Sequence, residues 1–586
     1  MANEIRDVIY GINGPVVTVK NSRTFSMMEM VRVGNLGLVG EVIGVTDKET
    51  TIQVYEETTG LRQGEPVVGT GRPMMATLGP GILDNIFDGI ERPLRDIADR
   101  TGALLDKGTN VPALDEDRLW DVSIEVKTGD NLMSGQIYAQ CQETEIIKHR
   151  IMVPPEMSGK VTFAADNGQY RISDVIVKLQ DEKGVEHELT LCQKWPIRRP
   201  RPVSGRMPAT VPLVTGQRVI DTLFPIAKGG AAAIPGGFGT GKTMTQHQLA
   251  KWCDADIIIY VGCGERGNEM AQVLSEFSEL VDPKSGRPMT DRTCLIANTS
   301  NMPVSAREAS IYTGITLAEY YRDMGYDVAI MADSTSRWAE ALREISGRLE
   351  EMPAEEGFPA YLPSRLSEFY ERAGRVRTLE GRDGSITIIG AVSPQGADFS
   401  EPVTQNTKRF VRCFWALDRE LAYSRHYPAI NWLESYSEYL ADLEDWYGEN
   451  VGQDFMEMRS EINEILHEES KLMAIAKLIG TDVLPDDQKL VIEVAKAVRV
   501  GFLQQNAFHA EDTFVSLEKQ RMMMHAILNM YAKAKKLVAA GVPLSKVTQL
   551  PYFEKLCRMK YDIPNGELYK FDELNAQIDK ALSEIN

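Results

Sequence analysis

The sequence has no long apolar run and little cysteine. Because no stretch of 18 or more apolar residues occurs, we expect no membrane-spanning helix. The first residues, MANEIRDV, are polar and charged, unlike a secretion signal. The 7 cysteines are scattered and contain no CxxC pair. This pattern excludes a disulfide framework and a structural zinc site, and it favours the reducing cytoplasm.

Positive charge is also scarce. The chain has 64 Lys and Arg against 84 Asp and Glu, a formal net charge of -20. Since affinity for nucleic acid and for anionic lipid comes largely from Lys and Arg, we expect no nucleic-acid partner and no direct membrane contact. A chain of 586 residues is too long to fold around a single hydrophobic core, so we expect several domains.

Apolar patterning divides the chain into five segments. Residues 1–75 are typical of short strands with turns and predict an N-terminal β-barrel. Residues 76–114 lead into the central region, and residues 115–190 are again strand-like and predict a compact β insertion, or bulge domain. Residues 191–435 alternate apolar runs with helical stretches, and residues 436–586 are mostly helical. We therefore expect a multidomain α/β protein.

The segment Trp195–Pro202 combines three arginines with three prolines. Its basic cluster could bind an anion. A solvated, proline-rich connector is the interpretation that composition favours.

Short apolar runs punctuate the central region. Continuous apolar strands between helices indicate a parallel sheet covered on both faces, and ligands bind at the carboxyl ends of such strands. The runs are Ala231–Ile234, Ile257–Val261, Cys294–Ala297, Val328–Ala332 and Ile386–Ile389.

A glycine-rich turn follows the first of these runs and matches G-x-x-x-x-G-K-[ST]. Its glycines let backbone N–H groups face phosphate oxygens, and the helical stretch Met244–Trp252 adds a helix amino terminus. An ordinary glycine-rich turn is the alternative, but the strand before it and the helix after it count against that. The residues expected to bind nucleotide are Gly236, Gly237, Phe238, Gly239, Thr240, Gly241, Lys242 and Thr243.

Two of these residues have distinct chemistry. Lys242 should reach the β- and γ-phosphates, and the Thr243 hydroxyl should hold Mg²⁺. Residues 191–435 are therefore predicted to be a P-loop, RecA-like nucleotide-binding domain that begins within residues 76–114.

Two carboxylates follow other strands of this region. Asp333 ends the run Asp327–Ala332 and could face Mg²⁺, with water between them. It could instead cap the helix that follows. Glu265 lies just past another strand and could orient an attacking water, with Arg266 beside it. Capping of the next helix is an equally open alternative for Glu265.

Several blocks of the sequence resemble the catalytic A subunits of V- and A-type ATPases. They include PGGFGTGKT, VGCGERGNEM, the long stretch Ala297–Pro353 and EPVTQNTKRFVRCFWALDRELAYSRHYPAINW. The resemblance runs essentially from end to end. It implies ATP hydrolysis or synthesis coupled to H⁺ or Na⁺ transport, with Mg²⁺ and ATP or ADP as cofactors.

The resemblance also implies residue roles. Lys242 and Thr243 match the family's phosphate and Mg²⁺ ligands, Glu265 its catalytic glutamate and Asp333 its strand-end acid. Arg266 matches the glutamate's neighbour. By the same resemblance, Tyr427 and Phe508 match residues of the family's adenine pocket. Phe514 is a weaker candidate for the wall of that pocket. Core packing is the alternative for these aromatics.

Partners are implied in the same way. A non-catalytic B subunit would alternate with this chain in a hexamer and supply an arginine in trans, and central and peripheral stalks would complete the complex. The expected location is the cytoplasm, peripheral to the cell membrane. Thr240 stands where eukaryotic A subunits carry cysteine, which favours a prokaryotic enzyme.

Three other functions compete with this interpretation. An RNA translocase would need a basic, aromatic groove, which the charge of -20 opposes. A secretion-type ATPase lacks the insertion, and a non-catalytic scaffold would not need Glu265. The Met-rich run Met522–Met524 could contact a rotor, although ordinary helical core is the favoured interpretation.

Overall fold

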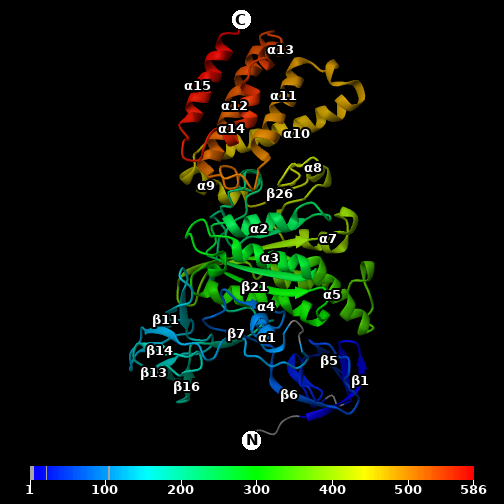
Figure 1. The fold of residues 1–586 in the computed structure, drawn as a ribbon, viewed down its shortest axis with the longest axis vertical. Coiled ribbons are helices and arrows are strands. Elements are labelled where there is room, and N and C mark those ends of the chain that lie inside the picture. The colour runs from blue at the N-terminus through cyan, green and yellow to red at the C-terminus, as the bar shows by residue number, and fades with distance from the viewer. Residues whose placement is uncertain (1–5, 21–22, 103–105, 586) are drawn as a thin grey trace. The chain divides into compact units, whose positions relative to one another are not determined.

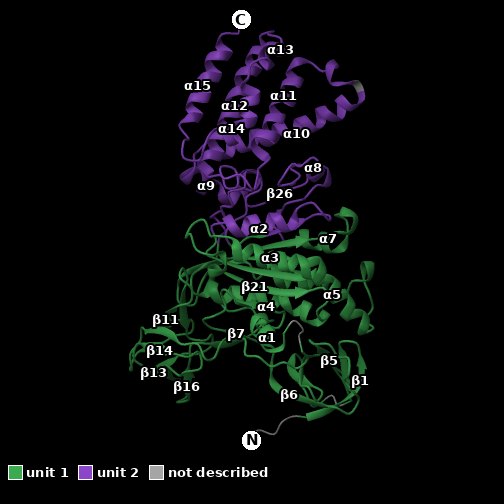
Figure 2. Ribbon diagram, viewed as in Figure 1, with its two compact units in different colours: residues 1–207, 229–231, 255–410 green, residues 208–228, 232–254, 411–586 purple. Residues whose placement is uncertain are grey.

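The computed structural model describes residues 6–20, 23–102 and 106–585, and Figure 1 shows the order of their elements. The described residues form two compact units (Figure 2). Unit 1 lies within residues 1–207, 229–231 and 255–410, and unit 2 consists of the rest of the described chain.

The first strands of unit 1 close into a barrel in the order β1-β2-β5-β4-β3-β6. Apolar residues alternate along these strands and fill the barrel, where Val17, Val31 and Ile52 are fully buried. This confirms the predicted N-terminal barrel. Its strands are β1 (Arg6–Asn13), β2 (Val16–Val19), β3 (Glu29–Val33), β4 (Leu38–Val45), β5 (Thr50–Val54) and β6 (Pro66–Pro73).

The β insertion consists of two four-stranded sheets, in the orders β10-β13-β15-β16 and β12-β11-β9-β14. All their pairings are antiparallel. Their strands are β9 (Trp120–Ile124), β10 (Asn131–Leu132), β11 (Ile137–Gln142), β12 (Lys148–Met152), β13 (Gly159–Ala164), β14 (Gly168–Tyr170), β15 (Val177–Gln180) and β16 (Glu186–Leu189). Flanking elements are β7 (Met75–Leu78), β8 (Ile86–Phe87), α1 (Leu94–Thr101) and β17 (Gln193–Pro196).

The segment Trp195–Pro202 is not a solvated connector, so that prediction was wrong. Arg201 is only 4% exposed. The Arg198 guanidinium lies 2.9 Å from the Glu41 carboxylate of the barrel and 2.7 Å from that of Glu308 in a central helix. Composition could not reveal this, because both carboxylates are far away in sequence.

A parallel sheet in the order β24-β22-β20-β21-β8 forms the centre of unit 1. Its long strands are almost wholly buried, as continuous apolar runs predict. Helix α4 packs against β20 and β22, and β18 and β23 add an antiparallel edge. The strands are β18 (Gly205–Met207), β20 (Ile257–Glu265), β21 (Thr293–Thr299), β22 (Asp327–Asp333), β23 (Gly374–Arg377) and β24 (Asp383–Val392). The helices are α3 (Gly267–Glu279), η2 (Met289–Arg292), α4 (Val304–Asp323), α5 (Thr335–Arg348), η3 (Glu355–Gly357), α6 (Leu362–Tyr370), η4 (Gln395–Ala397) and α7 (Pro402–Lys408).

Unit 2 contains three short strands and the C-terminal helices. β19 (Ala231–Pro235) pairs in parallel with β25 (Cys413–Phe414), which pairs antiparallel with β26 (Tyr436–Ser437). The helices are η1 (Val219–Leu223), α2 (Lys242–Trp252), α8 (Arg419–Tyr423), α9 (Leu440–Asn450), α10 (Phe455–Ile479), η5 (Thr481–Val483), α11 (Asp486–Lys496), η6 (Ala497–Leu503), α12 (Leu517–Ala539), α13 (Leu544–Thr548), α14 (Tyr552–Asp562) and α15 (Lys570–Ser583). The predicted helical C-terminal region is confirmed.

Two further expectations concern side chains. In the Met-rich run, Met523 and Met524 are fully buried in α12, which agrees with helical core. All 7 cysteines are free thiols. Among the described residues, no helix has both the length and the apolarity needed to cross a membrane.

Candidate phosphate loop and strand-end carboxylates

The glycine-rich turn connects β19 to α2 within unit 2. Its Gly239 and Gly241 have φ of 78° and 89°, and Gly241 is the residue that precedes the helix. Because L side chains avoid this left-handed region, the sharp turn requires glycine at both positions. The turn therefore delivers the amino terminus of α2, where the helix dipole favours an anion, to the end of the loop.

The loop is closed by its own side chains. The Lys242 ammonium donates to the carbonyl oxygens of Gly236 at 2.7 Å and Gly237 at 3.2 Å. The Thr240 hydroxyl also donates to Gly237, at 2.8 Å. Lys242 thus lies over the inside of the loop, where an anion's oxygens could replace the two carbonyls. Phe238 points outward and is 80% exposed.

A residue that the sequence did not single out packs on this loop. A Cβ atom on Gly237 would lie 2.8 Å from Nε and 2.9 Å from Nη2 of Arg419, the first residue of α8. The loop backbone and this exposed guanidinium are therefore in contact. Arg419 stands in the block WALDREL, but no spacing rule linked it to the loop.

The aromatic candidates also lie in unit 2 but differ in exposure. Tyr427 is 43% exposed, and its ring is 3.5 Å from where a Cβ on Gly241 would stand. Phe508 is 88% exposed. Neither is a core residue. Phe514 instead stacks on Trp252 of α2, with ring centroids 5.2 Å apart, and is a packing residue in this structure.

In unit 1, Glu265 is the last residue of β20 and is partly buried. Burial raises its pKa to about 8, and the negative charges of Asp333 and Glu269 contribute to the rise, against an opposing effect of Arg337. A carboxyl group with a pKa near 8 is mostly protonated at neutral pH, and its ionised fraction is what can accept a proton as a general base. Capping is not its role, since α3 begins after Arg266.

Asp333 ends β22 and is only 2% exposed. It stands opposite Gly262 of β20 and accepts a hydrogen bond from the Tyr260 hydroxyl at 3.2 Å. The residue in the cap position of α5 is Ser334, so Asp333 does not cap that helix. Its buried carboxylate remains a suitable oxygen ligand for a hard cation.

Arg266 is 64% exposed at its side chain, and its guanidinium lies 3.9 Å from the Glu269 carboxylate. Two arginines that the sequence did not single out also pack against the strand end. A Cβ on Gly264 would lie 2.9 Å from Cβ of Arg337 and 3.0 Å from Nε of Arg307. Both are brought there by helix starts far along the chain, which no local motif indicates.

The donor set fits magnesium of the kind that nucleotides carry. Among the described residues, no group of three or more His, Cys, Asp or Glu side chains could hold a metal by itself. Mg²⁺ in phosphoryl-transfer sites needs only one or two protein oxygens, because phosphates and water supply the others. Each unit by itself offers one such oxygen donor, the Thr243 hydroxyl in unit 2 and the Asp333 carboxylate in unit 1.

Comparison with protein families finds four matching descriptions along the chain. Residues 9–71 match the β-barrel domain of the ATP synthase alpha/beta family, and residues 216–437 match its nucleotide-binding domain. Residues 111–198 match the ATP synthase alpha/beta subunit barrel-sandwich domain. Residues 444–548 match the C-terminal domain of V and A type ATP synthase. One nucleotide-binding description thus spans the phosphate loop and both strand-end carboxylates.

Curated relatives match over nearly their whole length. The V-type ATP synthase alpha chain of Halothermothrix orenii is 60% identical over 575 residues, 98% of each chain. Alpha chain 2 of the V-type ATP synthase of Clostridium tetani is 59% identical over 98% of this chain and 97% of its own. The corresponding chain of the A-type ATP synthase of Methanopyrus kandleri is 56% identical over 100% of this chain and 99% of its own.

A solved structure supports the fold. The ATPase EscN from the type III secretion system of enteropathogenic E. coli matches with a TM-score of 0.64. The match covers 89% of this chain and 100% of EscN, at 20% sequence identity. At this low sequence identity, the match shows a shared fold and nothing about function.

Proposed function

The chain belongs to the family of V-type ATP synthase alpha chains and their A-type counterparts, and from that premise we propose how it turns over ATP. It is the catalytic, ATP-hydrolysing and ATP-synthesising subunit of a V/A-type rotary ATPase. The full-length identity of 60% carries this conclusion. Its relation to EscN, at 20% identity, does not support a secretion role.

Binding is the task proposed for unit 2. The loop N–H groups and the Lys242 ammonium hold the triphosphate, and the Thr243 hydroxyl is a ligand of Mg²⁺. Support comes from the contacts of Lys242 inside the loop, at 2.7 and 3.2 Å. The exposed rings of Tyr427 and Phe508 bind the adenine base, since exposed aromatic faces suit stacking.

Water activation is the task proposed for unit 1. Glu265 orients the attacking water and accepts its proton, and Arg266 supports it. Asp333 would help to hold Mg²⁺. Bound Mg²⁺ supplies positive charge that stabilises the anionic phosphoryl group. The raised pKa of Glu265, about 8, supports a base poised to gain and lose a proton.

The chain is one component of a larger complex, as its relatives' names state. We propose the finer assembly from the resemblance: alternation with a B subunit in a hexamer, an arginine supplied in trans, and stalks that transmit rotation to a membrane sector. The complex would sit in the cytoplasm at the membrane surface, moving H⁺ or Na⁺.

The decisive experiment compares the ATPase rate of the purified chain with that of the chain reconstituted with its B partner. A shared site predicts turnover only in the reconstituted sample, with Mg²⁺ present. Equal turnover by the isolated chain would contradict the shared site. Binding of MgATP by the isolated chain, measured by calorimetry, checks the phosphate loop separately.

A further inference from the structure

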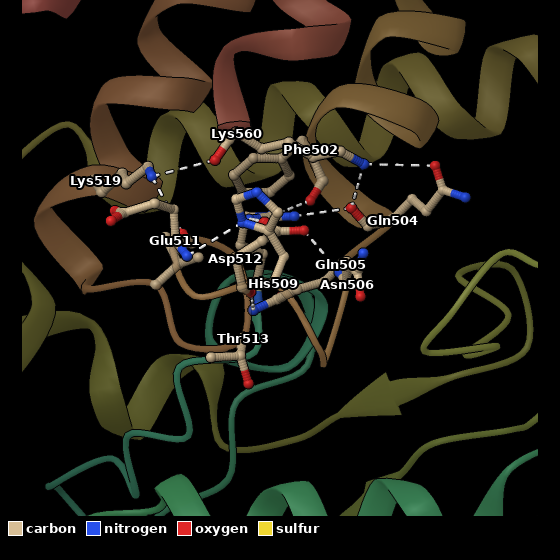
Figure 3. Close-up of polar contacts among 12 residues, drawn as sticks. Phe502, Gln504, Gln505, Asn506, His509, Glu511, Asp512, Thr513, Lys519 and Lys560 are labelled. Atoms are coloured by element: carbon tan, nitrogen blue, oxygen red, sulfur yellow. Dashed lines mark hydrogen bonds and ion pairs between the residues drawn. The ribbon is translucent and has the colours of Figure 1, made fainter. Parts of the chain in front are cut away.

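The loop of residues 504–513 in unit 2 carries the exposed ring of Phe508. Figure 3 shows the network of polar contacts of other residues in and around this loop. An exposed aromatic ring on a free loop would sample many positions and would lose entropy on binding a base. The contacts below this loop determine whether Phe508 is free or held.

Arg218 is the centre of the network and is fully buried. Its guanidinium donates to the Asp512 carboxylate at 2.5 Å and to the Gln504 carbonyl at 2.8 Å, and its Nε donates to the Phe502 carbonyl. These acceptors lie at the end of η6 and in the loop. One side chain therefore fixes where the loop begins and where it returns.

Asp512 transmits this constraint toward Phe508. Its second carboxylate oxygen accepts from the Asn506 amide at 2.6 Å. The Asn506 side chain in turn accepts from the Phe508 amide at 3.0 Å. Three consecutive contacts thus connect a buried guanidinium to the backbone that carries the exposed ring.

Gln505 joins the loop to the second aromatic candidate. Its backbone amide donates to the Tyr427 carbonyl at 2.7 Å. Its side chain accepts from the Arg218 amide at 2.9 Å and donates to the carbonyls of Gly216 and Asp512, each at 2.8 Å. Gln505 is only 4% exposed. Gln505 therefore links the loop that carries Phe508 to the backbone of Tyr427.

The far end of the loop is tied to the helix that follows the phosphate loop. The Trp252 indole at the end of α2 donates to the Thr513 hydroxyl at 3.1 Å. The Gln217 side chain donates to the Thr513 carbonyl at 3.1 Å. Since α2 begins at Lys242, the two loops share a rigid element inside the same unit.

Two lysines complete the cluster. The Lys560 ammonium donates to the carbonyls of Val500 at 2.7 Å and Gln504 at 2.8 Å, and Lys519 donates to the Asn565 side chain at 3.0 Å. Figure 3 shows both lysines beside the loop. Lys560 thus binds one carbonyl of η6 and the first carbonyl of the loop.

We propose that Arg218, Gln505 and Asp512 are positioning residues for the nucleotide base: they hold Phe508 and Tyr427 as a preformed platform at a fixed place relative to the phosphate loop. The inference rests on the proposed base-binding role of those two aromatics. None of the three touches the nucleotide itself. They act by removing the freedom of the loop before the base arrives.

The test measures two ligands on the full-length chain: MgATP, and magnesium tripolyphosphate, which has the phosphates without the base. Calorimetry gives the affinity ratio for the wild type and for Gln505→Ala, Asp512→Asn and Arg218→Lys. Arg521→Gln is the matched control, because its guanidinium lies 2.7 Å from Asp454, an ion pair of the same unit that is outside the 504–513 loop.

A positioning role predicts that each of the three variants loses about tenfold in MgATP affinity and keeps its tripolyphosphate affinity. A tenfold loss lies within the range of free energies that stacking of a base on an aromatic ring contributes. In the reconstituted complex the same variants should raise KM with kcat nearly unchanged. An unchanged ratio in all three variants would overturn the inference, as would an equal fall for both ligands. A wild type that binds both ligands equally would instead overturn the base platform itself.

Discussion

The two units differ in the charge that they offer to a ligand. Unit 2 presents donors: a loop of amides, the Lys242 ammonium and the exposed Arg419 guanidinium. Unit 1 presents acceptors: Asp333, which is 2% exposed, and Glu265, whose pKa burial and Asp333 raise to about 8. Donors hold a polyphosphate, whereas a partly protonated carboxyl holds and moves a proton.

Because of this difference, we expect unit 2 to determine the affinity for nucleotide and unit 1 to determine the rate of hydrolysis. Substitutions in unit 2 should change how tightly nucleotide binds, and substitutions at the strand ends of unit 1 should change how fast bound nucleotide reacts. The following experiments test this division.

Glu265→Gln should have the largest effect. Loss of the general base should lower kcat of the reconstituted ATPase by about 10²–10⁴-fold, while MgATP affinity changes little. Steady-state turnover and calorimetry on the same protein provide the two numbers. Glu276→Gln, in the neighbouring helix α3, is the matched control. Near-normal turnover would remove Glu265 from the mechanism.

Lys242→Ala should reduce MgATP affinity by roughly 10–100-fold, because hydrogen bonds to a charged group contribute about 1.5–3 kcal/mol. The isolated chain suffices for this measurement. Lys251→Ala, in the last turn of the same helix, leaves the loop intact and should bind normally. An affinity loss from Glu265→Gln as large as that from Lys242→Ala would contradict the division between the units.

Asp333→Asn should lower the pKa of Glu265 from about 8 by roughly 1 unit, because the substitution removes a nearby negative charge that raises it. Infrared titration of the nucleotide-free chain should show a protonated carboxyl band that disappears as pH rises through 8. The band should lose the Glu265 contribution in Glu265→Gln but keep that of Glu91, whose pKa burial also raises to about 8. In Asp333→Asn the Glu265 contribution should disappear at lower pH. A band that does not move would assign the raised pKa to burial and to Glu269 rather than to Asp333.

The same pKa sets a dependence of stability on pH. The folded chain keeps the Glu265 proton up to about pH 8, whereas the unfolded chain releases it near 4.5. Between those values the folded state binds more protons, so the contribution of Glu265 to stability falls as pH rises. Glu265→Gln should remove this component from the unfolding profile.

Lys560→Met should have the smallest effect, and its pH dependence has the opposite sign. Burial first, and then the charge of Arg218, lower the pKa of Lys560 to about 8 from 10.5. Above pH 8 the unfolded state binds more protons, so stability should rise between pH 8 and 10, by about 1–2 kcal/mol. Thermal unfolding should show a smaller rise for Lys560→Met than for the wild type. Lys555→Met, an exposed lysine of α14, should keep the full rise.

Local patterns predicted much of this molecule because local physics creates them. Alternating apolar residues give the barrel and the insertion, continuous apolar runs give the parallel sheet, and the glycines at 239 and 241 give the turn. Glu265 and Asp333 were found because each ends such a run. The functional roles of these residues remain proposals.

What the sequence did not predict depends on distant contacts. Arg307, Arg337 and Arg419 reach glycines of other segments through the fold, and nothing in their own surroundings marks them. The prediction for the basic segment Trp195–Pro202 was wrong for the same reason. Its charges looked solvated because the carboxylates that pair with them are remote in sequence.

That basic segment has a mechanical consequence. Arg198 lies between Glu41 of β4 and Glu308 of α4, within 2.9 Å of each, and the Tyr55 hydroxyl donates to Glu41 at 2.6 Å. Sliding the barrel past the central sheet of unit 1 would leave these buried charges unpaired, which is energetically expensive. These buried ion pairs therefore favour movement of the barrel and that sheet as one rigid body. A rotary ATPase needs a rigid part of this kind, relative to which other parts can turn.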